Sequence, residues 1–260
     1  MNNKISLTFT PEKFSDFLKK LKDLSSIDNC IKIKIQRDTL LMYTIKSEKS
    51  TIVALKSYSL KTSDYFDFDH DFVLDYVICN SVKFVKSLSI FMIGDTIEND
   101  VKVNLIYRKD AESMVVISGL FSSNKLKITC IGSEITEIRD VNQEFLEEKL
   151  DPDYAEWNFS VKKSDLTNIK KLSSIYSTDD SVFDITIESG IVTFSEKSRW
   201  ELSVSESTDM DYHKLTFVKK YLSNIDDTKD DIVFYVYDLF ILIKDDNSNL
   251  MLSFEQTWED

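Results

Sequence analysis

The residues best suited to chemistry lie in one acidic stretch, Asp67-Phe-Asp-His-Asp71. Alternating carboxylates can bind calcium or magnesium through their oxygens. An EF-hand loop starting at Asp67 needs glycine sixth and glutamate twelfth, but the chain has Phe72 and Ile78 there. The acids instead alternate with Phe66, Phe68 and Phe72, which predicts an acidic edge strand whose charges discourage aggregation. We therefore expect no metal ion in this stretch.

Histidines and cysteines are too few and too scattered to predict catalysis. The two histidines, His70 and His213, suggest no Ser-His-Asp or Cys-His set. The three cysteines, Cys30, Cys79 and Cys130, have no CxxC spacing, so we expect reduced, partly buried thiols. With only 4 glycines and 2 prolines, the chain has no glycine-rich phosphate-binding loop. These features argue against an enzyme and predict no cofactor.

The overall charge argues against nucleic-acid binding. The chain of 260 residues has a formal charge of -13, from 45 acidic and 32 basic residues, and 42% of it is hydrophobic. The length suffices for one large or two ordinary domains, and the hydrophobic content allows a real core. We see no signal-peptide pattern and no bilayer-spanning run, so we expect a soluble, cytoplasmic protein without a membrane partner. As a total, excess acid disfavours nucleic-acid binding, which usually needs a basic surface.

An internal repeat divides the sequence into two halves. Each half reads as a strand, an amphipathic helix, several strands, a second short helix and three closing strands. In the first half, Thr10 and Pro11 open a helix whose apolar face has helical spacing. That face consists of Phe14, Phe17, Leu18, Leu21 and Leu24, and the second helix covers about Ser81–Phe91. The predicted strands are Lys4–Phe9, Cys30–Gln36, Leu40–Lys46, Thr51–Leu60, Asp71–Ile78, Val101–Arg108, Ser113–Gly119 and Lys125–Ile131.

The second half repeats this order. Its helices are Ser164–Tyr176, with Ser164 as N-cap, and Val218–Ile225. A tight hairpin turn is expected at Ser189-Gly190. The predicted strands are Glu156–Val161, Val182–Glu188, Ile191–Ser195, Arg199–Ser205, Lys214–Phe217, Asp231–Tyr237, Phe240–Lys244 and Leu250–Gln256.

The repeat predicts two similar α+β domains, each with two helices packed on antiparallel sheets. The first domain covers 1–131 and the second 156–260. The segment between them, 132–155, is acidic, contains Pro152 and lacks a sustained pattern, so we interpret it as an interdomain connector.

Lysines gather on the predicted outer faces of the helices. Three of the four helices place lysine and hydroxyl groups there without an acid, while the first helix mixes its lysines with Glu12, Asp16 and Asp23. The candidate DNA-contacting residues are Lys13, Lys19, Lys20, Lys22, Lys83, Lys86, Lys163, Lys170, Lys171, Lys219 and Lys220. A flexible ammonium attracts phosphate without reading bases. Lysine also favours helices and solubility, which is the alternative explanation.

Two segments carry a resemblance to a known family. Asp71–Phe91 is similar to a strand-and-helix element of the T-even-type phage processivity factor, and Val161–Glu188 resembles its acidic-Leu helix and following strand. Both point to the DNA polymerase sliding clamps, the family that includes proliferating cell nuclear antigen. The order of predicted elements resembles this family along the whole chain.

The resemblance implies a DNA clamp fold that closes into a ring around duplex DNA. Helices would line the hole, and two domains per chain imply a homotrimer. The implied partners are a DNA polymerase and a clamp loader, docking through hydrophobic peptides near Ile135–Leu150 and Phe254–Trp258. A viral, bacteriophage source is also implied, so the compartment would be the host cytoplasm.

Two further expectations remain open at this point. One alternative function is an acidic binding module or DNA mimic, which should carry acids rather than lysines on its helices. For the ring, the subunit contact is expected to pair edge strands, with Val115–Leu120 and Phe240–Lys244 as candidates.

Overall fold

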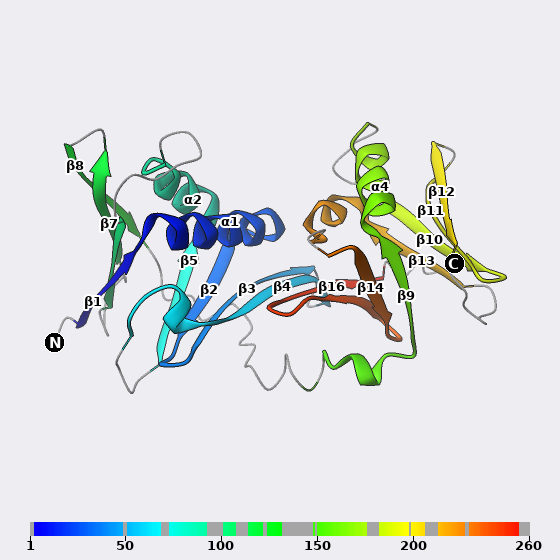
Figure 1. The fold of residues 1–260 in the computed structure, drawn as a ribbon, viewed down its shortest axis with the longest axis horizontal. Coiled ribbons are helices and arrows are strands. Elements are labelled where there is room, and N and C mark those ends of the chain that lie inside the picture. Colours follow the sequence, from blue (N-terminus) through cyan, green and yellow to red (C-terminus); the bar gives the residue numbers. More distant parts are fainter. Residues whose placement is uncertain are drawn as a thin grey trace. The chain divides into compact units, whose positions relative to one another are not determined.

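The computed structural model describes residues 3–48, 51–68, 73–92, 101–107, 114–121, 124–131, 148, 150–175, 182–197, 199–205, 213–226 and 229–254. The chain forms two compact units (Figure 1), one of Met1–Lys46 with Lys56–Asp140 and one of Ser47–Leu55 with Val141–Asp260. Both combine helices with antiparallel sheets, so the predicted α+β class is confirmed. The division falls inside 132–155, whose bounds as a connector stay a prediction.

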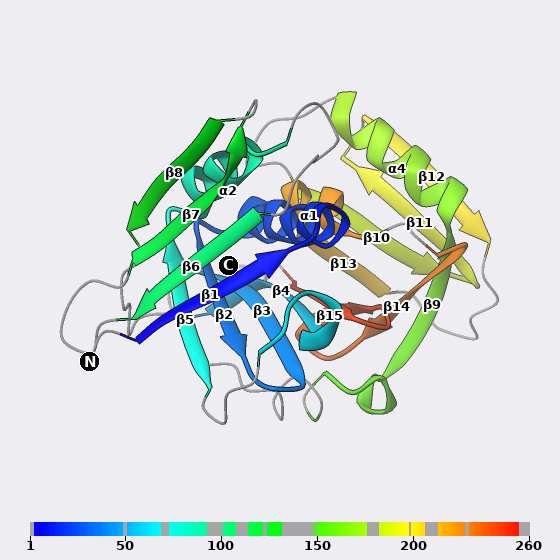
Figure 2. The same cartoon turned by 60° about the vertical axis from the view of Figure 1, so that its left-hand side comes forward.

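The first unit contains two sheets and two α-helices. One sheet has the strand order β1-β6-β7-β8, seen most easily in Figure 2, and the other has the order β5-β2-β3-β4. The helices α1 and α2 contact each other. In chain order the elements are β1 (Asn3–Phe9), α1 (Pro11–Ile27), β2 (Cys30–Ile35), β3 (Thr39–Glu48), β4 (Thr51–Lys61), the 3-10 turn η1 (Thr62–Asp64), β5 (Leu74–Cys79), α2 (Ser81–Ser89), β6 (Val101–Tyr107), β7 (Met114–Phe121) and β8 (Asn124–Ile131).

Aromatic side chains fix α1 against the core of the first unit. All five residues of the predicted apolar face are buried, as expected from their helical spacing. Phe9, at the end of β1, is fully buried, and its ring centroid lies 5.7 Å from that of Phe14 and 4.9 Å from that of Phe17. Burying each such side chain contributes roughly 1.5–3 kcal/mol. The opposite face of α1 is thereby directed away from the core.

The helix α2 starts from a left-handed residue. Asn80 has φ 60°, a conformation that asparagine tolerates, and its side chain accepts a hydrogen bond from the Lys83 N–H at 3.2 Å. Phe84, Val85 and Leu88 are then buried. This cap and the buried apolar stripe fix the orientation of α2. The lysine side chains of α2, which lie outside the stripe, therefore face outward.

The second unit repeats the layout. One sheet has the order β12-β11-β10-β13, and a second runs β4-β16-β15-β14-β9. The helix α4 contacts β9, β12 and η3. The elements are the 3-10 turn η2 (Pro152–Tyr154), β9 (Trp157–Lys162), α4 (Lys163–Ile175), β10 (Val182–Glu188), β11 (Ile191–Glu196), β12 (Trp200–Ser205), β13 (His213–Val218), the 3-10 helix η3 (Lys219–Asn224), β14 (Asp231–Val236), β15 (Phe240–Lys244) and β16 (Ser248–Ser253).

The first half of β4 groups with the second unit, although the sequence places it in the first domain. Ser47–Leu55 belongs to this unit because β4 lies beside β16. Ser253 Oγ, at the end of β16, donates to the Ile52 carbonyl at 2.5 Å. The strands β4 and β16 lie far apart in the sequence, so no local sequence pattern predicts that they are neighbours.

Phenylalanines build the core of the second unit. Phe159, Phe183, Phe194, Phe217 and Phe234 are at most 1% exposed and come from five different strands. The Phe159 and Phe234 rings stack at 4.9 Å, and the Phe183 and Phe217 rings stack at 5.4 Å. Offset aromatic pairs of this kind add to the stabilisation that burial alone provides.

Several expected details are wrong. Ser164 is not an N-cap, because α4 begins at Lys163, whose N–H donates to the Asp230 carbonyl at 2.8 Å. The second helix of this unit is 3-10 rather than α. Asp67 lies in no strand, although it is exposed between buried Phe66 and Phe68. The remainder of the acidic stretch, 69–71, lies outside the described residues.

Both strands expected at the subunit contact lie inside sheets. The candidate Val115–Leu120 falls within β7, which lies between β6 and β8, and Phe240–Lys244 is β15, between β14 and β16. Neighbours on both sides already take their backbone hydrogen bonds. Among the described strands, the ends of the sheet orders are the places with unused pairing capacity.

The turn at Ser189-Gly190 is confirmed and gives a first prediction. Glu188 pairs directly with Ile191, and the two turn residues have φ 51° and 78°, as a two-residue type I′ turn requires. Because a Cβ is unfavourable at the left-handed Gly190, Gly190→Val should destabilise the second unit by about 1–2 kcal/mol. Urea unfolding measures this, with Ser189→Asn as the tolerated control. Equal stability of Gly190→Val and the unchanged chain would contradict the assignment.

Candidate nucleic-acid interface

Seven of the predicted lysines are exposed on the described helices. On the first unit they are Lys19 and Lys22 of α1 and Lys83 and Lys86 of α2; on the second they are Lys163, Lys171 and Lys220. The buried stripes of α1, α2 and α4 orient these side chains outward. No acid lies in α2 or η3, and Asp165, the acid of α4, is half-buried. We call these seven residues the lysine faces.

Lys20 does not belong to the lysine faces, contrary to expectation. Its ammonium lies 2.5 Å from Asp16 and over the rings of Tyr58 and Tyr65, at 5.7 and 5.8 Å from their centroids. The side chain is only 17% exposed. It is thus held by an ion pair and by cation–π contacts within the unit.

The acids of α1 are neutralised inside the first unit. Asp16 accepts from the Tyr65 hydroxyl as well as from Lys20, and Asp23 accepts from the Tyr58 hydroxyl at 2.5 Å. Lys56, only 2% exposed, lies 3.2 Å from Asp23. The third acid of α1, Glu12, is exposed. The outward surface of α1 is therefore more positive than its sequence suggests.

Lys13 and Lys170 are partly engaged by backbone carbonyls. The Lys13 ammonium donates to the Ser63 carbonyl at 3.4 Å, and Lys170 donates to the Ile225 carbonyl at 2.6 Å. Lys170 therefore ties α4 to the end of η3 instead of extending outward.

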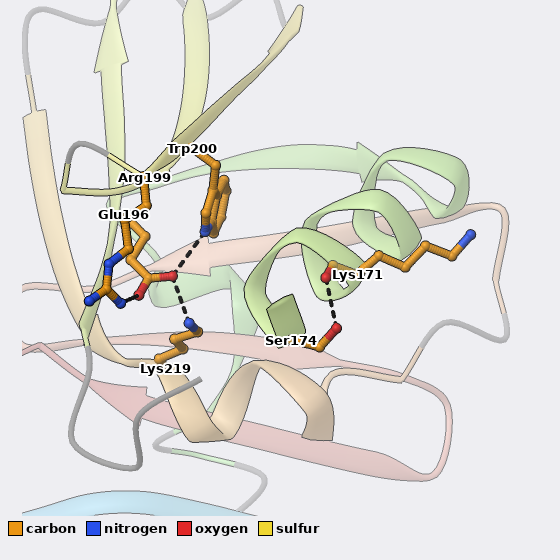
Figure 3. A network of polar contacts seen from close by, with 6 residues as sticks. All are labelled: Lys171, Ser174, Glu196, Arg199, Trp200 and Lys219. Atoms are coloured by element: carbon orange, nitrogen blue, oxygen red, sulfur yellow. Dashed lines mark hydrogen bonds and ion pairs between the residues drawn. The ribbon is translucent and has the colours of Figure 1, made fainter. Parts of the chain in front are cut away.

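Lys219 is buried, so its predicted place on the outer surface is wrong. It is 5% exposed, and its ammonium contacts Glu196 at 2.6 Å (Figure 3). The Glu196 side chain is 2% exposed and also accepts from Trp200 Nε1 at 2.9 Å and from Arg199 at 2.9 Å. Figure 3 shows Lys219 directed toward this cluster, whereas Lys171 extends away from it. The 3-10 geometry of η3 changes which side chains face outward, because its turn holds fewer residues than an α-helical turn.

The hydroxyls beside the exposed lysines are used within the helices. Ser87 donates to the Lys83 carbonyl, Thr167 to Lys163, Ser174 to Lys171 and Ser223 to Lys220, at 2.7–3.0 Å. Such bonds to the preceding turn occupy the hydroxyl proton. The lysine ammoniums are therefore the donors that these faces offer to phosphate.

The buried carboxylate gives a pH prediction. Burial alone would raise the pKa of Glu196, but the bonds from Lys219 and Trp200 and the charge of Lys219 outweigh it and lower the pKa below its ordinary 4.5. The stabilisation from Glu196 is therefore fully present above about pH 4.5 and is lost as the pH falls through the lower pKa of the folded state. Urea midpoints measured against pH should fall more steeply below pH 4.5 in the unchanged chain than in a Glu196→Gln, Lys219→Met double variant. Parallel pH curves would contradict this.

Other sites find no support among the described residues. There, no three His, Cys, Asp or Glu side chains gather as metal ligands, and no helix is long and apolar enough to cross a bilayer. Cys30 and Cys79 are partly buried, as expected. His213 is exposed at the start of β13, with its ring centroid 5.9 Å from that of Trp157.

The repeated layout of helices and antiparallel sheets is that of the DNA clamp fold, as solved structures confirm. A chain of the PCNA2–PCNA3 complex from Sulfolobus tokodaii superposes with TM-score 0.65 at 10% identity, covering 96% of this chain and 99% of that one. PCNA from Thermococcus kodakaraensis gives TM-score 0.65 at 12% identity, covering 97% and 100%. The DNA polymerase III subunit beta from Pseudomonas aeruginosa gives TM-score 0.63 at 9% identity, covering 98% and 65%.

These likenesses show the fold. No protein-family description matches the sequence, and no curated protein matches it. The clamp fold predicted from the sequence is thus confirmed, while the closer resemblance to the T-even phage clamp stays a prediction.

Proposed function

We propose that the chain is a non-enzymatic sliding clamp that encircles duplex DNA and tethers a DNA polymerase as a processivity factor. The observation that carries this proposal is the exposure of the lysine faces in a chain whose formal charge is -13. Ammonium groups on flexible stems attract phosphates without sequence preference and weaken with salt. A protein that held DNA by these contacts alone would lose it readily, so retention by a closed ring suits such a surface.

The sheet orders support ring closure. In the repeat, β4 is equivalent to β12, and β8 is equivalent to β16. The orders β13-β10-β11-β12 and β1-β6-β7-β8 end at β12 and β8, whereas β4 and β16 are neighbours in the order β5-β2-β3-β4-β16-β15-β14-β9. Within the chain β4 lies beside β16, whereas β8 and β12 each have one neighbour among the described strands. Pairing β12 of one copy with β8 of the next repeats the β4–β16 arrangement head to tail, and such contacts generate rings. We propose a homotrimer, as the clamp resemblance implies.

Of the expected docking segments Ile135–Leu150 and Phe254–Trp258, only residues 148, 150 and 254 are among the described residues. A docking surface for the polymerase and a clamp loader is proposed on the second unit. Tyr154 is 72% exposed and Leu239 is 56% exposed. Tyr237 stacks on Phe240 at 4.4 Å and donates to the Asp151 carbonyl at 2.6 Å, which holds η2 beside the turn between β14 and β15. Burial and the charge of Asp151 raise the pKa of Tyr237 to about 12, so this hydroxyl remains a donor. The exposed apolar side chains suit a hydrophobic peptide, and the charges of Asp151 and Asp153 near Tyr237 suit basic residues in that peptide.

The alternative is an acidic module or DNA mimic. A mimic needs carboxylates in place of phosphates on its exposed helices, and the lysine faces have the opposite charge. We therefore propose the clamp, which would act in the cytoplasm, that of the host cell if the protein is viral.

The test separates encirclement from ordinary binding. Linear duplex attached to a surface at one end is incubated with the protein, and the other end is then blocked by a bulky protein. We expect a trimeric mass in solution and retention at high salt on the blocked duplex, with rapid loss when the end is open. Closed circles of the same sequence should acquire little protein. Equal retention on circles, or a monomer at high micromolar concentration, would refute the ring.

A further inference from the structure

Two cysteines face each other across neighbouring strands of the first unit. Cys30 begins β2 and Cys79 ends β5, and the two residues are directly paired in this antiparallel ladder. Directly opposed residues have Cα atoms about 4.5–5.5 Å apart and side chains on the same face of the sheet. Disulfides span Cα separations of about 4.4–6.8 Å. The Cα separation typical of such a pair therefore lies within the range that a disulfide spans.

The thiols lie on the side of the sheet that faces away from the core. Ile31, next to Cys30 and so on the other face, is fully buried in the core cluster. Lys32, on the same face as Cys30, forms an ion pair with Asp75 of β5 at 3.2 Å. Both cysteines are partly exposed, and β5 is the end strand of its sheet. A small dissolved oxidant can therefore reach them.

The cysteine pair adjoins the junction that holds α2. Ser81, the first residue of α2, is fully buried; its N–H donates to the Asn29 carbonyl at 2.8 Å and its hydroxyl to the Asp28 carbonyl at 3.2 Å. Asp28 caps the end of α1. A covalent bond between Cys30 and Cys79 would reinforce the place where α1 ends and α2 begins.

We propose that Cys30 and Cys79 form a redox modification site that closes to a disulfide with a small-molecule disulfide such as oxidised glutathione. One cysteine thiolate attacks glutathione disulfide, giving a mixed disulfide and releasing one reduced glutathione. The second cysteine attacks the mixed disulfide, forms the Cys30–Cys79 bond and releases a second reduced glutathione. The protons lost by the cysteines pass to the departing thiolates, and the electrons of both thiols reduce the oxidant.

The experiment titrates the folded, full-length chain with defined ratios of oxidised and reduced glutathione. Remaining thiols are alkylated, and digestion with mass spectrometry identifies cross-linked peptides. We expect the Cys30 and Cys79 thiols to be lost together, at one ratio, in the unchanged chain and equally in Cys130→Ser. Oxidation should also slow hydrogen exchange at the backbone amides of Phe84–Leu88, because the bond restrains the start of α2.

Other oxidation products would contradict the proposed disulfide site. Single glutathione adducts that never resolve into a cross-link, even at the most oxidising ratio, would show that the opposed thiols do not join. A cross-link that involves Cys130 in the unchanged chain and disappears in Cys130→Ser would assign the reactivity elsewhere. Because the key measurement uses the unchanged chain, its outcome does not depend on whether Cys30→Ser or Cys79→Ser folds.

Discussion

Replacing Lys219 with methionine should lower the free energy of unfolding of the second unit by about 3–5 kcal/mol, as when one partner of a buried ion pair is removed. The variant leaves Glu196, with a side chain 2% exposed, without the cation that contacts it at 2.6 Å. Arg199 also contacts Glu196, but its side chain is 44% exposed and therefore offsets the loss only in part. Urea unfolding followed by circular dichroism measures the difference.

The matched control is the neighbouring lysine. Lys220 is exposed and lies 5.0 Å from the Tyr221 ring centroid, so Lys220→Met should change stability by no more than about 0.5 kcal/mol. Adding Glu196→Gln to Lys219→Met removes the uncompensated charge and should recover a large part of the loss. If both lysine variants unfolded at the same urea concentration, the buried pair would contribute nothing, and Lys219 could again be placed among the surface lysines.

Local patterns were sufficient for the elements but not for the fate of each lysine. Helical spacing of apolar residues found α1, α2 and α4, and alternation found most strands within a few residues. The position of Glu196 could have been found as well, because it continues the inward alternation of Val192 and Phe194 along β11. The partner of Glu196 could not have been found in this way, because Lys219 lies 23 residues away in the sequence.

The same limit applies to the acids of α1. A helical wheel places Asp16 and Asp23 among lysines and so weakens the prediction of a positive face. Their partners Tyr58, Tyr65 and Lys56 come from β4 and the segment after η1, 33 to 49 residues away in the chain. Asp16 also pairs locally, with Lys20 one turn further along the helix, but the Lys56 ammonium that neutralises Asp23 cannot be found from a local pattern. This tertiary ion pair makes the lysine faces more uniform than the sequence suggests.

Reversing one lysine in each unit should separate DNA binding from assembly. Lys83→Glu with Lys171→Glu changes exposed residues of α2 and α4, and in the proposed trimer each change occurs once per subunit. We expect duplex affinity to fall on the order of 10-fold or more at about 0.1 M salt. The slope of log affinity against log salt should also decrease by about one for each phosphate that the protein no longer neutralises. Both are measured by fluorescence anisotropy on short duplexes of different sequence.

A second pair of substitutions keeps the charge change and moves it off the helices. Lys61→Glu with Lys244→Glu alters one exposed lysine on β4 and one on β15, again one in each unit. Since the net charge falls equally in both variants, long-range repulsion of DNA is matched. The helix variant alone should bind more weakly and with a smaller salt dependence, equally for all sequences, while both keep the trimeric mass. An equal decrease in affinity in the two variants would mean that net charge governs DNA affinity, and that the lysine faces do not bind phosphate themselves.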